Sequence, residues 1–498
     1  MVWFAVTSVM RTIELEFQQP YPRLVLHHKE AEALEVLHRR LAQLLAFLDE
    51  SENQLNDDDE TTKEWKARIK EVALRIEDEI ESEIIDILEF TREFMELVKN
   101  KQPMKDLQIK DDDDDIPSSS QKIGHRHHSA GSKLRSTTMV GLYPKLDVQT
   151  GFNRYGSLFC FHDDGHMTPQ VYQLPATPHF KRLRVLDLGS LHFITGIPSY
   201  VADLILLRYL ALRPSKSLSS LPVLKDWNLQ TLVLLENWGV STSAEDPKPL
   251  IPEIWELPKL RHLQFCRTIV LGTPTVVHQC IQTVQWLRPF QCTEQVFLRI
   301  PNAKVMGIFM EGSVEFGEPN CLDNLRCLNQ LEELKIESRH NPVLLPVVDA
   351  FPVQLKKLKL KGTLVPWDAM RVIGMLPNLQ VLKLKNGACQ GEYWELTEDG
   401  FRQLKSLLIY GSDLRHWYAT GDNNFSVLER LILKECYELE GIPSSFGDIP
   451  TLQLIELCHC YTRLVNSANQ IQEVQRYYGN DGLVVRAYNI WIRLQVTL

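Results

Sequence analysis

The sequence predicts an α/β solenoid with a parallel β ribbon on its concave face, preceded by an N-terminal α-helical hairpin or coiled-coil bundle. Two observations lead to this prediction. The pattern LxxLxL recurs from residue 183 onward, and two amphipathic stretches with helical spacing occupy residues 30–100. With 44% hydrophobic and 24% charged residues, the composition is that of a soluble globular protein. Its 498 residues suffice for a repeat array and a separate head.

The repeat is defined by its spacing. From Leu331 onward the unit starts are 24 or 25 residues apart, which is the period of a leucine-rich repeat. Each LxxLxL points alternate side chains of a short strand inward, and a single unit cannot bury that face alone. We therefore expect about twelve stacked units. They start at Leu183, Leu207, Leu229, Leu260, Ile281, Ala303, Leu331, Leu355, Leu379, Leu404, Leu428 and Leu452.

The array is less regular in its first half. A polar insertion at residues 236–249 lengthens the unit that starts at Leu229, and residues 281–328 keep the period poorly. We expect the array to bend or loosen between 281 and 328. After the last unit, residues 464–478 predict a helix and residues 483–492 a strand, which together would cap the solenoid.

The head is predicted from apolar residues at i, i+3, i+4 and i+7. They define one helix over residues 30–50, which includes Leu41, and a longer one over 62–97, which includes Ile69. Joined by a short polar turn, the two helices would form an antiparallel hairpin. The following residues contain the Asp111–Asp115 run and a stretch rich in Ser, His and Gly, and predict a disordered linker.

These patterns divide the chain into six segments. They are a poorly defined N-terminal segment at 1–29, a helical coiled-coil head at 30–100, an acidic and polar linker at 101–150, a repeat N-terminal cap at 151–182, the leucine-rich repeats at 183–463 and a C-terminal cap at 464–498.

Charge and cysteine usage narrow the class of protein. The net charge of −10 is concentrated in residues 1–120, whereas the remainder is faintly basic, so neither part is suited to a nucleic-acid backbone. No stretch approaches the roughly 20 apolar residues of a membrane span. All ten cysteines lie at or after Cys160 without an evenly spaced framework, which favours a reducing compartment. We expect a cytoplasmic protein, and the sequence is also compatible with peripheral association with a membrane.

Three stretches of the sequence are distinctive: WKARIKEVALRIEDEIESEI at Trp65–Ile84, GSLFCFH leading to FKRLRVLDL, and VNSANQIQEVQRYYGNDGLVV near the C-terminus. They resemble plant intracellular immune receptors of the coiled-coil, leucine-rich-repeat type, in particular the late-blight resistance family of nightshades. Glu77-Asp78-Glu79-Ile80-Glu81 stands where that family has its EDVID-type motif. The resemblance implies disease resistance, protein recognition by the repeats, and contact of the acidic motif with the repeats.

One part of the family pattern is missing. Family members carry a nucleotide-binding module that holds ADP or ATP between head and repeats. Here no GxxxxGK[ST] phosphate-binding loop exists; the nearest fragment, Gly131-Ser132-Lys133, lacks the upstream glycine and the final Ser or Thr. We therefore expect no cofactor and no enzymatic activity.

The candidate binding residues lie at outward positions of the predicted strands. Lys335, Lys359 and Lys383 occupy the middle outward position of successive units, and Lys357, Lys361 and Lys385 flank them. Because like charges side by side destabilise a sheet, such a ladder suggests a partner: an acidic surface of another protein, or the acidic head itself. The alternative is a solvated face whose long side chains splay apart. Glu77, Asp78, Glu79 and Glu81 are either the matching contact patch or an ordinary charged helix face.

The run Cys458-His459-Cys460 has two interpretations. It could be part of a metal site, but no second ligand pair is spaced to complete a tetrahedron. Cys436 and Cys460 both fall eight residues after the first leucine of a unit, where such repeats carry a buried Asn or Cys. We therefore expect structural cysteines and no metal, and no catalytic constellation is placed on a suitable turn.

The sequence thus predicts a non-catalytic protein-recognition module of plant innate immunity. Its partners would be a pathogen effector, a guarded host protein or full-length receptor relatives. The alternative function is a leucine-rich-repeat scaffold or substrate adaptor outside immunity.

Overall fold

The computed structural model divides the chain into two compact units, Met1–Leu191 and His192–Leu498. The structure describes residues 6, 41, 69, 137–142, 155–161, 183–188, 204–212, 228–234, 249–250, 254–255, 257–265, 270–310, 320–396, 400–419 and 424–491. Leu41 and Ile69, from the apolar faces of the two predicted head helices, are helical and buried. The rest of the predicted head, including Glu77, Asp78, Glu79 and Glu81, lies outside the described residues.

In the first unit, three strands run parallel: β1 (Thr137–Leu142), β2 (Tyr155–Phe161) and β3 (Val185–Asp187). β2 lies in the predicted N-terminal cap. The linker prediction for residues 101–150 is wrong at Thr137–Leu142, because these residues pair with β2 along their whole length. The stretch TTMVGL is rich in residues that favour strands, but it is too short to stand out against the polar composition around it.

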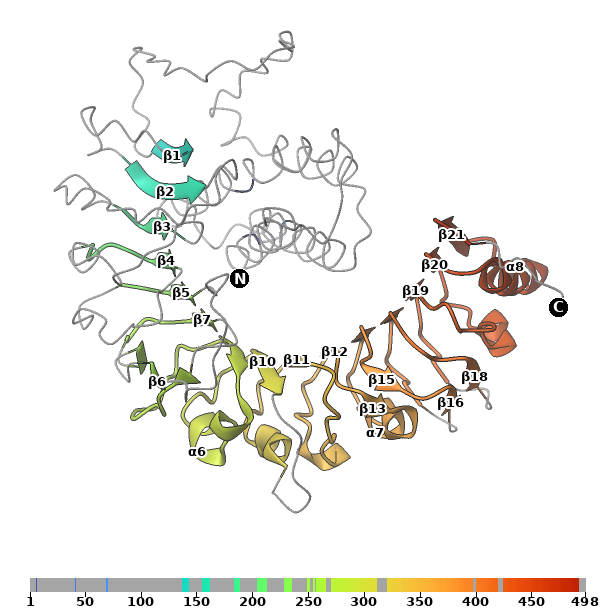
Figure 1. Ribbon diagram of the computed structural model, residues 1–498, viewed down its shortest axis with the longest axis horizontal. Coiled ribbons are helices and arrows are strands. Elements are labelled where there is room, and N and C mark those ends of the chain that lie inside the picture. Colours follow the sequence, from blue (N-terminus) through green and yellow to red (C-terminus); the bar gives the residue numbers. More distant parts are fainter. Residues whose placement is uncertain are drawn as a thin grey trace, which may run out of the picture. The chain divides into compact units, whose positions relative to one another are not determined.

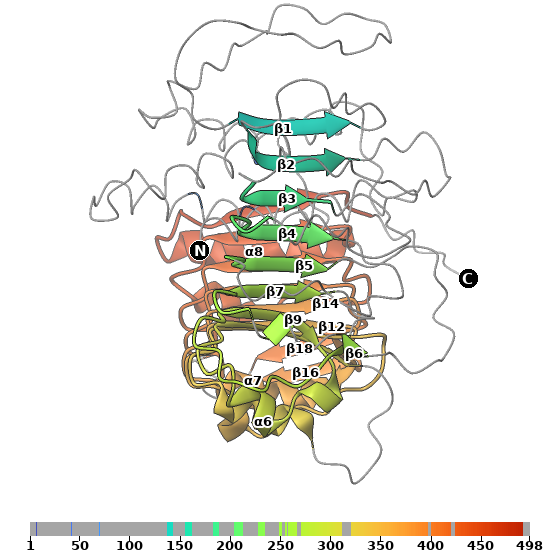
Figure 2. The same cartoon turned by 90° about the vertical axis from the view of Figure 1, so that its left-hand side faces the viewer.

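In the second unit, each strand of the main ladder pairs in parallel with the next (Figures 1 and 2). The strands are β4 (Tyr209–Leu212), β5 (Thr231–Leu234), β7 (His262–Phe265), β9 (Thr283–Leu287), β10 (Val305–Met310), β11 (Glu333–Ser338), β12 (Lys357–Lys361), β14 (Val381–Lys385), β17 (Ser406–Tyr410), β19 (Arg430–Lys434), β20 (Leu454–Cys458) and β21 (Val484–Tyr488). All of these except β21 begin two residues after a predicted unit start. The leucine-rich-repeat solenoid is confirmed.

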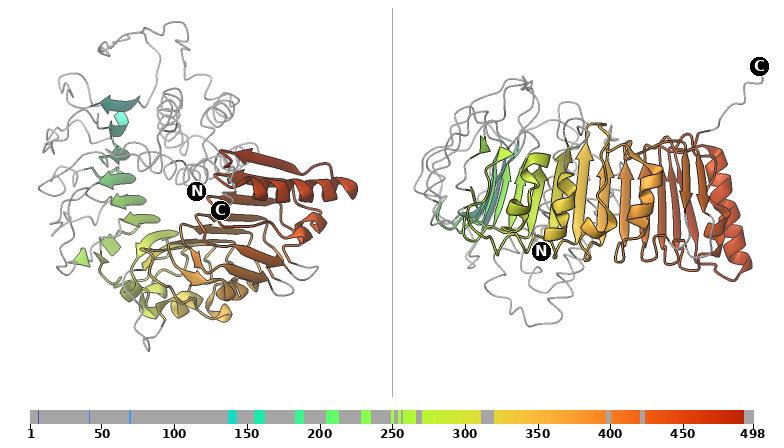
Figure 3. Two further views of the ribbon diagram at one scale, coloured as in Figure 1. Left: turned by 45° about the vertical axis from the view of Figure 1, so that its right-hand side comes forward. Right: turned by 90° about the horizontal axis from the view of Figure 1, so that it is seen from below.

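The core is built from the inward positions of these strands. Leu334, Leu358 and Leu382 are register partners on β11, β12 and β14, and all three are buried. The next inward row, Ile336 and Leu360, is buried as well. Full burial of one such side chain contributes about 1.5–3 kcal/mol, so each added unit extends one continuous apolar core. Strands line the inner side of the curved unit, and short helices line its outer side (Figures 1 and 3).

Several strands are followed by a residue in the left-handed backbone conformation. Gly362, Asn386 and Gly411 follow β12, β14 and β17 with φ of +63°, +46° and +63°. Their backbone N–H groups donate to the carbonyls of Lys385, Tyr410 and Lys434 on the next strand. Glycine and asparagine tolerate this conformation best, and the repeated turn keeps the strands stacked in one register.

The irregular stretch remains paired. β9, β10 and β11 continue the parallel ladder, but Gln285 and Trp286 together oppose Gly307, and Trp286 has φ of +75°. Of the two alternatives expected for 281–328, to bend or to loosen, the described residues contradict the second: the ladder continues, and a β-bulge absorbs the irregular spacing. A Cβ on Gly307 would lie 3.1 Å from the Trp286 nitrogen, so the small residue gives the bulge its space.

The outer side carries short elements and two-stranded ladders. The helices and 3₁₀ turns are η5 (Pro289–Gln291), α6 (Glu294–Phe297), η6 (Cys321–Cys327), η7 (Val348–Ala350), η8 (Trp367–Ala369), α7 (Met370–Gly374) and η9 (Ser444–Asp448). The short strands are β6 (Pro249–Leu250) with β8 (Val270–Leu271), β13 (Val365–Pro366) with β15 (Cys389–Gln390), and β16 (Tyr393–Leu396) with β18 (His416–Ala419). The rings of three tryptophans in these elements stack in succession: Trp367 of η8, Trp394 of β16 and Trp417 of β18.

The last unit is followed by α8 (Thr462–Tyr477) and then β21, in the region where the sequence predicts a helix and a strand. Leu464, Ala468 and Ile471 bury one face of α8. Gln475 continues that face, and its amide donates to the Ile449 carbonyl at 2.7 Å. Within the described residues, none of the helices is both long enough and apolar enough to cross a membrane.

Candidate protein-recognition surface

The six predicted lysines lie together on the concave side of β11, β12 and β14. Lys335, Lys359 and Lys383 are direct register partners across the three strands. Lys361 and Lys385 are partners in the next outward row. We call these five residues and Lys357 the lysine patch. Adjacent strands lie about 4.8 Å apart, so the structure brings all six lysines into one small area, as the sequence pattern predicts.

Two glutamates of β11 accompany the lysine patch. The Lys335 ammonium lies 3.4 Å from the Glu333 carboxylate, and the Lys359 ammonium lies 3.9 Å from that of Glu337. Lys359 and Glu337 are both buried. A buried ammonium that has lost its hydration is costly without an anionic group beside it. Lys359 and Lys385 are buried, so at these two positions the alternative of a fully hydrated, splayed side chain does not hold.

Next to the lysine patch lies an apolar cluster of Leu408, Tyr410 and Ile432, all buried. These residues occupy outward positions of β17 and β19, and Leu408 is the register partner of both Lys383 and Ile432. Our prediction from sequence covered only the lysines. The signal was present: in LKSLLIY and LERLILK the middle outward positions, Leu408 and Ile432, are apolar, although a solvated strand face carries polar residues there.

Beyond the apolar cluster the concave face is charged again. Lys434 of β19 and Glu456 of β20 lie 3.9 Å apart, and both are buried. The register places Arg486 of β21 beside Glu456. The concave face from β11 to β20 therefore has an apolar centre with charged residues on both sides, an arrangement that is typical of protein–protein interfaces.

The cysteines of the last units are structural. The buried thiols of Cys436 and Cys460 donate to the carbonyls of Ile409 and Leu433, 3.6 and 3.5 Å away. Burial raises the pKa of Cys436 and of Cys460, and raises that of Cys458 to about 11. Protonated thiols are poor metal ligands and poor nucleophiles. Within the described part of the chain, no three His, Cys, Asp or Glu residues are grouped to hold a metal ion.

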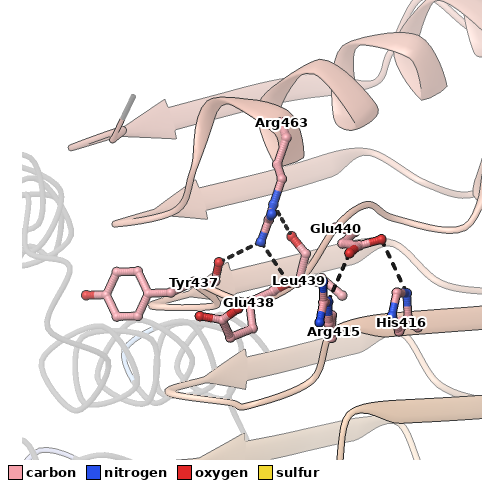
Figure 4. A network of polar contacts seen from close by, with 7 residues as sticks. All are labelled: Arg415, His416, Tyr437, Glu438, Leu439, Glu440 and Arg463. Atoms are coloured by element: carbon pink, nitrogen blue, oxygen red, sulfur yellow. Dashed lines mark hydrogen bonds and ion pairs between the residues drawn. The ribbon is translucent and has the colours of Figure 1, made fainter. Parts of the chain in front are cut away.

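A polar network joins residues of the last units (Figure 4). The Glu440 carboxylate accepts from Arg415 at 3.0 Å and lies 3.3 Å from His416, and the Arg415 hydrogen bond lowers the pKa of Glu440. Arg463, at the start of α8, donates to the carbonyls of Tyr437 and Glu438 at 2.8 Å and of Leu439 at 3.0 Å. Its donors are engaged with backbone, so this network anchors α8 to the preceding unit.

Comparison with known proteins gives relatives among resistance proteins. The putative late blight resistance protein homolog R1B-13 of Solanum demissum is 31% identical over 332 residues, 64% of this chain and 28% of the relative. Homolog R1B-12 of the same species is 31% identical over 310 residues, 60% of this chain and 22% of the relative. The chain thus spans about a quarter of the length of the curated relatives it matches. No protein-family model matches it.

Two solved structures show a low similarity to this chain. The Leptospira interrogans LRR protein LIC12759 has a TM-score of 0.35 and 14% identity, over 67% of this chain and 90% of that one. The mouse RP105/MD-1 complex has a TM-score of 0.39 and 14% identity, over 68% of this chain and 55% of that one. Similarity this low carries no functional argument. On the sequence comparison, this leucine-rich-repeat chain is similar over 60% or more of its length to the late blight resistance protein homologs of Solanum demissum.

Proposed function

We propose that the chain is a non-catalytic recognition module of a disease-resistance-like protein, and that it binds a partner protein through the concave strands β11 to β20. The observation that carries this proposal is the lysine patch beside the apolar cluster on one continuous ladder. Affinity at interfaces comes mostly from a few well-packed apolar and aromatic residues, and surrounding charges set orientation and specificity. This surface offers both.

The chemistry of the surface defines the partner. A matching protein surface would place an apolar residue against Leu408, Tyr410 and Ile432, and carboxylates against the lysine patch. A pathogen effector, a guarded host protein or a full-length relative could supply these groups. The acidic helix predicted in the chain's own head, around Glu77–Glu81, offers the same chemistry in cis. The similarity to resistance protein homologs favours this role over a scaffold or substrate adaptor outside immunity.

The test uses the full chain and a synthetic peptide of residues 72–87 as an acidic, amphipathic probe, with binding measured by biolayer interferometry. The double variant Lys359→Glu, Lys383→Glu should weaken binding at least tenfold, because it turns attraction into repulsion. Arg476→Glu, an exposed charge reversal on α8, is the matched control and should bind as the parent chain does. Raising the ionic strength should weaken parent binding, since screening acts on charge pairs.

A second variant separates charge from packing. Ile432→Asp leaves every lysine in place and inserts a charge into the apolar cluster, so it should also weaken the probe. Binding that is equal in the parent, the lysine double variant and Arg476→Glu would overturn the proposed surface. Tight binding of ATP or ADP to the purified chain would contradict the expectation that the chain holds no cofactor.

A further inference from the structure

A pair of cysteines on the outer side of the second unit is not used by the recognition surface. Cys292 directly follows η5, in the unit that starts at Ile281, and Cys321 begins η6, in the next unit. The two turns are in contact, and each cysteine side chain is close enough to shift the pKa of the other. A second contact joins the same two turns: the Asn324 side chain of η6 donates to the Cys292 carbonyl at 2.8 Å.

The two thiols differ in their surroundings. Cys292 is buried and its thiol donates to the Arg288 carbonyl at 3.3 Å, whereas Cys321 is partly exposed. The Cys292 thiol can turn to the Cys321 sulfur, and this hydrogen bond, together with the backbone N–H groups of Cys321 and Leu322, lowers the pKa of Cys321. The same contact and burial raise the pKa of Cys292. Because Cys321 is the more exposed of the two thiols and has the lower pKa, we expect Cys321 to be the nucleophile towards a disulfide in solution.

We propose that Cys292 and Cys321 are a redox modification site, which forms a reversible intrachain disulfide when the chain meets a low-molecular-weight disulfide such as oxidised glutathione. The Cys321 thiolate attacks one sulfur of that disulfide and releases one thiolate, which takes up a proton. The Cys292 thiol then loses its proton and attacks the Cys321 sulfur of the mixed disulfide, releasing the second thiol. The two cysteines are oxidised by two electrons and the small disulfide is reduced to two thiols.

The position of the pair gives the bond a structural effect. It would tie together two consecutive units on either side of the bulge at Gly307, the point where the parallel register shifts. A covalent link closes the chain between residues 292 and 321, which restricts the unfolded chain and stabilises the folded one. The inference is independent of the proposed recognition surface, because it depends only on the outer loops.

Mass spectrometry tests the site directly. After treatment with oxidised glutathione and alkylation, trypsin should yield the peptide of residues 268–299 linked to that of residues 305–326, two hydrogens lighter than their sum. The first peptide also contains Cys280, which could form the link in place of Cys292. The experiment is therefore done with Cys280→Ser, a substitution at an exposed position. Dithiothreitol should restore the separate peptides.

Two further variants make the outcome specific. Cys321→Ser should abolish the linked peptides. Cys327→Ser should keep them: Cys327 is partly exposed like Cys321, but burial raises its pKa. Oxidation should raise the melting temperature in the parent chain and in Cys327→Ser, and not in Cys321→Ser. Two results would overturn the proposal: Cys321 held as a stable mixed disulfide with glutathione, or linkage of Cys327 as frequent as that of Cys321.

Discussion

The ammonium of Lys359 lies 3.9 Å from the carboxylate of Glu337 on the neighbouring strand, and both side chains are almost fully enclosed, with 10% and 5% of their surface exposed. We expect Glu337→Gln to destabilise the chain by about 1–3 kcal/mol, because it removes the negative charge that lies beside a buried ammonium. Urea unfolding at neutral pH measures the change. Glu395→Gln, an exposed glutamate on β16, should change stability by less than about 0.5 kcal/mol, and equal effects would contradict the assignment.

Gly362 should not tolerate a side chain. Its φ is +63°, and a Cβ would lie 2.4 Å from the Ser338 carbonyl oxygen. Gly362→Ala should cost at least about 1–2 kcal/mol for the left-handed backbone, and more for the clash. Gly479→Ala has a similar positive φ but nothing within 4 Å of the new Cβ, so it isolates the backbone contribution. Thermal unfolding of both variants should show a clearly larger loss for Gly362→Ala.

His262 should make the chain sensitive to acid. It is buried on β7, its Nδ1 lies 3.1 Å from the Thr283 hydroxyl, and burial lowers its pKa from 6.5 to about 3. In the unfolded chain the histidine binds a proton below pH 6.5, whereas in the folded chain it stays neutral down to about pH 3. Stability therefore falls as pH drops through this window, by up to about 1.4 kcal/mol per pH unit.

His262→Gln tests this contribution, because glutamine is polar and does not titrate. Unfolding free energies of the parent and the variant are compared at pH 7, 6, 5 and 4. As the pH falls, the unfolding free energy of the parent should decrease relative to that of the variant. Parallel curves would show that His262 is not the responsible group.

The stacked tryptophans of the outer side should contribute strongly to stability. Trp394 is 1% exposed, and its ring lies 4.7 Å from that of Trp367 and 4.9 Å from that of Trp417. Trp394→Ala should cost about 3–5 kcal/mol, since it opens a cavity in a packed core. Its neighbour Tyr393 on the same strand is 59% exposed. Tyr393→Ala is the control, and a loss as large as that of Trp394→Ala would refute the packing argument.

The fold followed from the sequence because its signal is repeated. Each LxxLxL start predicts a strand, and the ladder strands from β4 to β20 begin two residues after those starts, even in the irregular stretch. A single inward leucine predicts a strand only weakly. A series of leucines at a constant period can be buried together only if the strands stack in one register. β1 and the bulge at Gly307 were missed, because a six-residue strand and a one-residue register shift produce no periodic pattern.

The sequence by itself determined the repeat, its strand positions and the grouping of six lysines on three strands, because period and alternation are local properties of the chain. Only the tertiary structure decided what surrounds those residues. It put Leu408 beside Lys383, enclosed Lys359 with Glu337, and brought Cys292 to Cys321 across 29 positions of sequence. Such contacts depend on where each turn ends and on the register between units, which packing sets and no single segment encodes.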